Sequence, residues 1–250
     1  DEDTFYNIIG LIHMSPYLQI EGLHYFTGTQ KRSLEQLKKE IDYIDDFLLR
    51  LKDKTGCDVR CLEYGPGIAV PYFRGKTPET YDDSGFERLA DLLDGMRWGG
   101  EITIEMGRAF AATCGYYLTG ICDVKTNGGT NYCIVDGGNH QMNYDGQIRG
   151  MYEPYLCMLP ERPEDREDKW TVCGSLCSVN DILCRNVSLS GVRTGRTLVF
   201  ERAGAYSAME GMALFLSHAL PKVVSYSKES GWELLRARKE TYPMNMVENA

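Results

Sequence analysis

The residues with the clearest chemical potential lie in a polar loop, Gly174-Ser175-Leu176-Cys177, which is followed by Asp181. A thiol in a tight loop can donate a proton or act as a nucleophile. A lone cysteine is more often a small buried hydrophobe, so this loop alone is weak support for a site. Whether this loop belongs to a functional site depends on other short runs along the chain.

Three such runs follow predicted strands: Phe26-Thr27-Gly28-Thr29, Gly65-Pro66-Gly67 and Glu105-Met106-Gly107-Arg108. Threonine hydroxyls and glycine backbone N–H groups can bind a phosphate, although most such runs are only turns. A Glu and an Arg can form an exposed ion pair of little energetic value. Equally, they can supply a carboxylate for a ring nitrogen and a guanidinium for a phosphate. A fourth run, Gly204-Ala205-Tyr206, offers a hydroxyl.

The first half of the chain alternates predicted strands and helices. Ser33 and Gln36 have the spacing of a capping box that opens a long amphipathic helix, and Gly56 can end it. Strand–loop–helix units with polar loops at the strand ends indicate a parallel sheet, in which ligands bind at the carboxyl ends of strands. The predicted strands cover residues 18–26, 59–64 and 101–105, and the predicted helices cover residues 33–54 and 82–96.

The pattern changes near residue 112, where short strands separated by glycine turns begin. The predicted strands there are residues 115–125, 131–136, 170–173 and 197–201. We therefore expect α/β plus β architecture: part of a (β/α) barrel over 1–112, and an antiparallel β domain with a C-terminal helix over 113–250. A closed eight-unit barrel needs about 200 residues or more, so three units make less than half of one. A partner or an upstream segment should cover the exposed sheet edge.

The composition of the chain disfavours several classes of protein. With 27 Lys and Arg against 36 Asp and Glu, the net charge is −9, which disfavours nucleic-acid binding. No apolar run approaches the roughly 18 residues of a membrane span, and the acidic residues 1–3 do not fit the pattern expected of a signal peptide. Nine scattered cysteines indicate reduced thiols and a cytoplasmic location. Four widely separated histidines give no metal-binding pattern.

Taken in order, these runs resemble the fold-type III pyridoxal-phosphate amino-acid decarboxylases, the diaminopimelate/ornithine decarboxylase group. The resemblance extends from about residue 18 to residue 225. It implies an alanine-racemase-like barrel and pyridoxal 5'-phosphate as cofactor. Six ordered matches carry it: Phe26–Thr29, Gly65–Gly67, Glu105–Arg108, Asp136–Gly138, Gly174–Cys177 and Gly204–Tyr206.

The resemblance also implies roles for individual residues. Glu105 would keep the pyridine nitrogen of the cofactor protonated. Cys177 would be the catalytic proton donor to the carbon that has lost CO2, across the interface of a homodimer with shared active sites. The phosphate would be held by Thr29, Gly65, Gly67, Gly107, Arg108 and Tyr206.

Departures from the family pattern concern the ring and the substrate. Phe26 stands where the family has a ring-stacking His, and Pro66 removes one backbone donor from the phosphate loop. Tyr144 stands near the place of an Arg that grips a substrate carboxylate, and Ser178 replaces an acidic residue. With His140 and Asp181, these two form the expected substrate-binding set. Asn139-His140 and Phe215–His218 resemble a secondary-metabolism subgroup, whose substrates include amino acids attached to a carrier protein.

The lysine that carries the cofactor in this family lies on an early barrel strand, upstream of every run matched here. We therefore expect the natural protein to be longer, or a separate chain to supply that half, and this polypeptide alone to be inactive. A non-catalytic regulatory or binding relative is the alternative, favoured by Phe26, Pro66 and Ser178. Retention of Glu105, Arg108, Cys177 and Tyr206 together favours the enzyme. A racemase is disfavoured because racemases of this fold type use a tyrosine base where this chain has the Cys loop.

Overall fold

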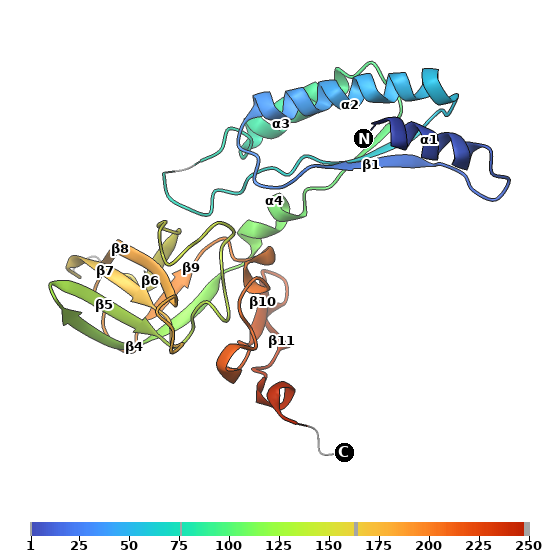
Figure 1. Ribbon diagram of the computed structural model, residues 1–250. Helices are drawn as coiled ribbons and strands as arrows, with labels where there is room; N and C mark the ends of the chain where they lie inside the picture. Colours follow the sequence, from blue (N-terminus) through green and yellow to red (C-terminus); the bar gives the residue numbers. More distant parts are fainter. Residues whose placement is uncertain (1, 76, 163–164, 248–250) are drawn as a thin grey trace. The chain divides into compact units, whose positions relative to one another are not determined.

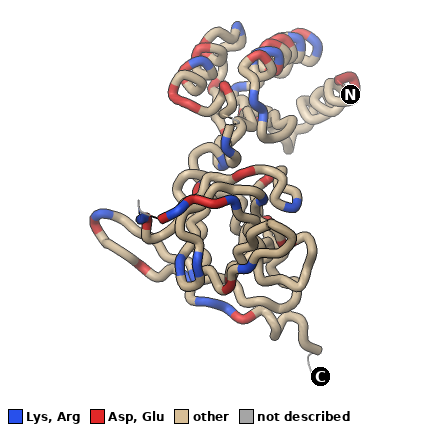
Figure 2. Tube along the Cα trace, turned by 90° about the vertical axis from the view of Figure 1, so that its left-hand side faces the viewer, with Lys and Arg blue, Asp and Glu red and all other residues tan. Residues whose placement is uncertain are grey.

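The computed structural model describes residues 2–75, 77–162 and 165–247 (Figure 1). The chain forms two compact units. The α/β unit comprises Asp1–Pro71 and Lys76–Phe110, and the β unit comprises Tyr72–Gly75 and Ala111–Ala250. Basic and acidic residues are interspersed along the chain (Figure 2). Within the described residues, no helix is long and apolar enough to cross a bilayer.

A three-stranded parallel sheet with the order β1-β2-β3 is the centre of the α/β unit. Figure 1 shows α2 and α3 on one side of these strands. Alternate strand residues such as Leu62 and Tyr64 are buried on the helix side, whereas His24 and Glu63 are exposed. The elements are α1 (Glu2–His13), β1 (Gly22–Phe26), α2 (Leu34–Thr55), β2 (Cys61–Gly65), α3 (Asp83–Asp94) and β3 (Glu101–Ile104), followed by the short α4 (Gly107–Ala111).

Helix α2 forms because apolar residues recur at three- and four-residue spacing and bury one stripe against the sheet. It ends at Gly56, whose left-handed backbone (φ 71°) lets its N–H bond to the carbonyl of Lys52. The predicted capping box is wrong: Ser33 has N-cap backbone geometry, but its side chain makes no capping hydrogen bond. The first N–H of the helix, from Leu34, instead donates to Glu79 Oε2 at 3.4 Å.

Helix α1 was not predicted. It packs on α2 through buried Tyr6 and Ile9. Its Glu2 carboxylate bonds to two residues of α2: Arg50 Nη2 at 3.1 Å and the Tyr43 hydroxyl at 2.9 Å. These polar contacts lie on exposed surface, so burial of the apolar side chains is the larger stabilising contribution.

The β unit contains a six-stranded sheet with the order β6-β9-β4-β5-β7-β8 and a separate β10–β11 hairpin. Its pairs are antiparallel except β5–β7, which is parallel, so the expected all-antiparallel domain is corrected at that pair. The strands are β4 (Tyr117–Asn127), β5 (Thr130–Val135), β6 (Leu156–Leu159), β7 (Glu167–Cys173), β8 (Ile182–Ser190), β9 (Thr197–Phe200), β10 (Val223–Ser227) and β11 (Gly231–Arg236).

The predicted C-terminal helix is wrong. Residues 223–236 form the β10–β11 hairpin, and the described segment that follows contains only the 3-10 turn Tyr242–Asn245. Val223 and Val224 are β-branched and favour a strand, and Gly231 adopts φ 69° at the turn. Three further 3-10 turns lie at Ala112–Cys114, Tyr206–Ala208 and Phe215–Ser217.

A buried ion pair fixes the loop after β1. Lys31 is 5% exposed, and its Nζ lies 2.6 Å from Glu40 Oε2 and 2.9 Å from Thr27 Oγ1. The Tyr64 hydroxyl donates to the same carboxylate at 3.2 Å, and burial together with that carboxylate raises the pKa of Tyr64. Because Glu40 belongs to α2, this network joins the loop to the helix side of the sheet.

Lys31→Met should lower the free energy of unfolding of the α/β unit by about 1–3 kcal/mol, because it removes the cation from the partly buried Glu40 carboxylate, which keeps only its bonds from Thr27 and Tyr64. Urea denaturation measures the loss. The control is Lys38→Met, whose pair with Asp42 is exposed and should contribute less than about 1 kcal/mol. Equal losses for the two variants would contradict the assignment of Lys31 as a structural anchor.

Candidate active site

Three residues predicted to bind a cofactor meet at the carboxyl ends of the parallel strands. Phe26 ends β1 and is the register partner of Gly65, which ends β2. Glu105 directly follows β3, and its N–H donates to the carbonyl of Tyr64 at 2.9 Å. An ideal Cβ on Gly65 would lie 2.8 Å from Phe26 Cδ2 and 3.4 Å from Glu105 Oε2. The missing side chain of Gly65 therefore gives the aromatic ring and the carboxylate room to approach each other.

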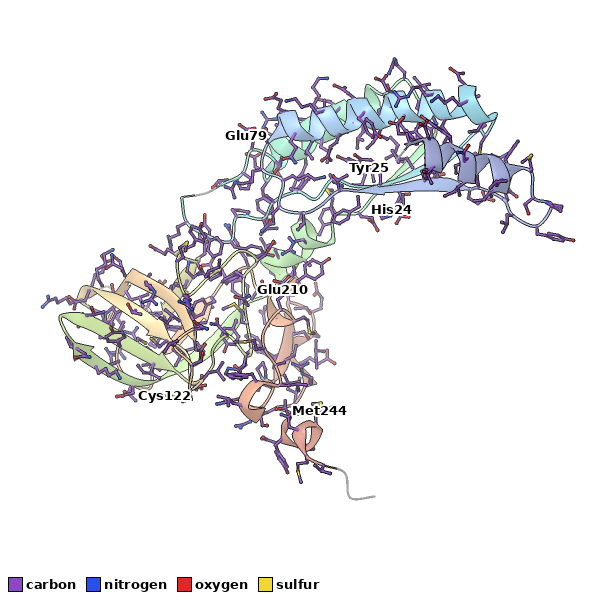
Figure 3. All side chains as sticks on the ribbon, in the orientation of Figure 1. His24, Tyr25, Glu79, Cys122, Glu210 and Met244 are labelled. Carbon is purple, nitrogen blue, oxygen red and sulfur yellow. The ribbon has the colours of Figure 1, made fainter. Side chains whose placement is uncertain are left out.

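A histidine that was not predicted joins this group. His24 Nε2 lies 3.0 Å from Glu105 Oε2, with the two side chains 54% and 48% exposed. Figure 3 shows His24 on β1, on the side away from α2, with Tyr25 on the helix side. The available signal was the two-residue strand period, which puts His24 and Phe26 on the same face.

The two predicted phosphate loops touch each other. Gly67 adopts φ 63°, and a Cβ there would lie 2.0 Å from the Gly28 carbonyl oxygen and 3.1 Å from Thr29 Cα. Lys31 ties the loops together, because its N–H donates to the Gly67 carbonyl at 2.8 Å and its carbonyl accepts from Ala69 at 3.0 Å. Only glycine permits this backbone approach at position 67. Gly107 and Arg108 open the short helix α4.

Cys177 and Tyr206 lie in the β unit, where both are exposed. Tyr206 opens the 3-10 turn after Gly204, and that glycine is required because a Cβ would lie 2.2 Å from the Ala111 carbonyl oxygen. Ser178, next to the thiol, is half-buried.

Asp181 organises the Cys177 loop. Its carboxylate is 2% exposed and accepts two backbone N–H groups at 2.8 Å, from Leu176 and from Asn139. Its own carbonyl accepts the Gly174 N–H at 2.9 Å. Cβ atoms at Gly138 or Gly174 would collide with this carboxylate, at 2.6 and 2.2 Å. Since both oxygens are occupied and buried, we revise its predicted role from substrate contact to positioning of the loop.

The Asp136-Gly137-Gly138 turn lies against the same loop. Asp136 Oδ1 accepts from Thr119 Oγ1 at 2.6 Å, and Gly138 N–H donates to the Tyr117 hydroxyl at 3.3 Å. Burial raises the pKa of Tyr117 to about 12, so this phenol stays protonated at neutral pH. The Gly137 carbonyl accepts the Ser175 N–H at 2.8 Å. The turn and the thiol loop therefore form one hydrogen-bonded structure.

Tyr144 and His140 lie inside the β unit, which corrects their predicted substrate contact. Each is 2% exposed. The Tyr144 hydroxyl donates to the Glu201 carbonyl, and its ring packs 5.1 Å from that of Tyr72. The His140 ring lies 4.7 Å from the ring of His218, and burial followed by the His218 charge lowers the pKa of His140. A side chain that contacts substrate must be accessible, and these two side chains are buried.

Comparisons with known proteins identify the family of the chain. The family described as pyridoxal-dependent decarboxylase, C-terminal sheet domain, matches residues 12–204. The chain belongs to this pyridoxal-dependent decarboxylase family. It is 27% identical over 236 residues to a diaminopimelate decarboxylase of Methanocaldococcus jannaschii, covering 90% of this chain and 50% of that protein.

Two further similarities mark the range of relatives. An L-glutamyl-[BtrI acyl-carrier protein] decarboxylase of Niallia circulans is 25% identical, with 95% of this chain and 57% of that protein covered. The crystal structure of the M. jannaschii diaminopimelate decarboxylase with L-lysine superimposes with a TM-score of 0.80 at 23% identity, covering 97% of this chain and 55% of that one. The chain thus spans about half the length of the relatives it matches.

Asp181→Asn should loosen the Cys177 loop, because an asparagine turns an NH2 donor toward one of the two N–H groups. We expect a loss of about 1–3 kcal/mol in the stability of the β unit, measured by urea denaturation. Amide hydrogen exchange at Leu176 and Asn139 should accelerate. Asp123→Asn, at an exposed carboxylate of β4, is the control. Unchanged exchange at Leu176 would remove Asp181 from this role.

Proposed function

We propose that this chain is part of a pyridoxal-phosphate-dependent enzyme that decarboxylates an amino acid. The observation that carries the proposal is the meeting of Phe26, Gly65 and Glu105 at one sheet edge. The adjoining contact between Gly28 and Gly67 supports it. The α/β unit would then be the C-terminal part of an alanine-racemase-like barrel in a cytoplasmic homodimer.

The residues present fit the cofactor. Phe26 offers an aromatic face to a pyridine ring, and Glu105 offers a carboxylate to its nitrogen. The closely packed backbone at Gly28 and Gly67, with the exposed Thr29 hydroxyl beside it, fits a phosphate group. Gly65 fits as the residue that leaves room for the ring, a different role from the predicted phosphate contact. We keep Gly107, Arg108 and Tyr206 as proposed phosphate ligands.

Bound pyridoxal phosphate supplies an electron sink for the electrons released when CO2 departs. The contribution of this chain is charge placement and proton delivery. The Glu105 carboxylate would hold a proton on the ring nitrogen, which favours that electron flow. The Cys177 Sγ–H would give its proton to the carbon that has lost CO2. Asp181 would keep that thiol in place by accepting the Leu176 N–H of its loop and the Asn139 N–H of the turn beside it.

The substrate we propose is an amino acid resembling diaminopimelate, lysine or ornithine, or one presented by a carrier protein. The relatives support both options, since their names include a diaminopimelate decarboxylase and a decarboxylase of a carrier-bound glutamyl group. Ser178 stays in the proposed substrate set because it is half-buried beside the exposed thiol, and it brings a neutral hydroxyl where the family resemblance expects an acidic side chain.

Cys177→Ala in the intact protein should lower kcat for CO2 release by about 10²-fold or more, since it removes a general acid. The absorbance spectrum of the bound cofactor should not change. Cys122→Ala is the matched control, because Cys122 is an exposed thiol on β4 of the same unit (Figure 3). If both variants turn over at the wild-type rate, Cys177 is not the proton donor.

The cofactor lysine should map outside these 250 residues. Lys31 is buried, but its ammonium is held by Glu40 and Thr27 on the helix side of the sheet, away from the face of His24. Borohydride treatment of the intact protein should fix the cofactor covalently, and peptide mass mapping should find it on a lysine of another segment or chain. A label on Lys31, or on any lysine of this chain, would contradict the proposal.

A further inference from the structure

The contact between His24 and Glu105 joins the two outer strands of the α/β sheet across the central one. The register pairs His24 with Glu63 and Phe26 with Gly65, while Glu105 follows the strand paired on the other side of β2. A side chain at Gly65 would enter this space, since its ideal Cβ lies 3.4 Å from Glu105 Oε2. The missing side chain at Gly65 therefore leaves room for the Glu105 carboxylate beside β2, where His24 contacts it.

The chemistry of the pair leaves one carboxylate oxygen available. A carboxylate has two acceptor oxygens, and an imidazole with its proton on Nε2 donates one hydrogen bond. The 3.0 Å contact engages Oε2 of Glu105. A second N–H, such as that of a protonated ring nitrogen, can then bond to Oε1. Holding one oxygen also restricts the rotation of a side chain that is otherwise half exposed.

Phe26 and His24 divide between them two functions that a single histidine could perform. Phe26 can present a ring face but has no N–H to donate. His24 lies two residues earlier on the same face of β1 and supplies an N–H to the carboxylate instead of a face to the ring. The chain thus combines a non-polar stacking surface and a separate hydrogen-bond donor at the same edge of the sheet.

We propose that His24 is a positioning residue, which holds Glu105 Oε2 so that Oε1 faces the ring nitrogen of the cofactor. The proposal rests on the proposed function, since it requires Glu105 to serve that nitrogen. The competing explanation is an exposed surface pair, which would contribute little to stability and leave the cofactor unaffected. The two explanations differ in the expected protonation of the cofactor's ring nitrogen and in the expected affinity for the cofactor.

The test uses the intact protein loaded with pyridoxal phosphate that carries 15N at the ring nitrogen. The 15N chemical shift reads whether that nitrogen is protonated, and a titration gives the dissociation constant of the cofactor. His24→Leu should move the shift toward the unprotonated value and weaken cofactor binding roughly tenfold, the effect of about 1.4 kcal/mol. His13→Leu, at an exposed histidine of α1, should change neither.

Two polar variants separate the hydrogen bond from a general effect on folding. His24→Gln places an amide nitrogen near the position of Nε2 and should restore the wild-type shift and affinity. His24→Asn places its amide near Nδ1, too short to reach Glu105, and should behave as His24→Leu does. Equal behaviour of the Gln and Asn variants would overturn the proposal.

Glu105→Gln distinguishes failure of this inference from failure of the proposed function. If Glu105→Gln changes the 15N shift and His24→Leu adds nothing in that background, the two residues act as one unit. If Glu105→Gln changes the shift and His24→Leu alone does not, the role of His24 is overturned while the proposed function stands. If Glu105→Gln has no effect on the shift, the role of Glu105 and the inference both fall.

Discussion

The parallel register of β1, β2 and β3 is the constraint on which the candidate site depends. Because neighbouring strands run in the same direction, residues 39 or more positions apart in the chain end at one edge of the sheet. The buried Lys31–Glu40 pair and the contact between Gly28 and Gly67 then fix the loops that leave this edge. Phe26, Gly65 and Glu105 need no special local conformation to meet, since the register brings them together.

In the β unit, the Cys177 thiol is positioned by a buried side chain and not by strand register. No regular strand places Cys177; instead, a buried carboxylate collects the N–H groups of the loop and of the turn beside it. A buried carboxylate that accepts several N–H groups is a strong organiser, because leaving those donors unpaired would cost free energy. The exposed thiol thus sits on a rigid support. Both units combine an accessible functional group with a buried polar anchor.

The sequence was most informative where function depends on local pattern. Alternating apolar residues and glycine-rich strand ends predicted the three parallel strands and the residues at their ends. Roles that depend on distant partners could not be predicted in this way. The sequence predicts Asp181 as a substrate ligand, because its spacing from Cys177 says nothing of Asn139, which lies 42 positions away. His24 was missed because its partner Glu105 lies 81 positions away, across a gap created by a glycine.

A crystal structure of the intact protein with pyridoxal phosphate bound tests the central claim most directly. The account predicts the ring against Phe26, its nitrogen within hydrogen-bond distance of Glu105, and its phosphate at Thr29 and Gly67. A cofactor bound elsewhere, or one whose ring nitrogen points away from Glu105, would contradict it.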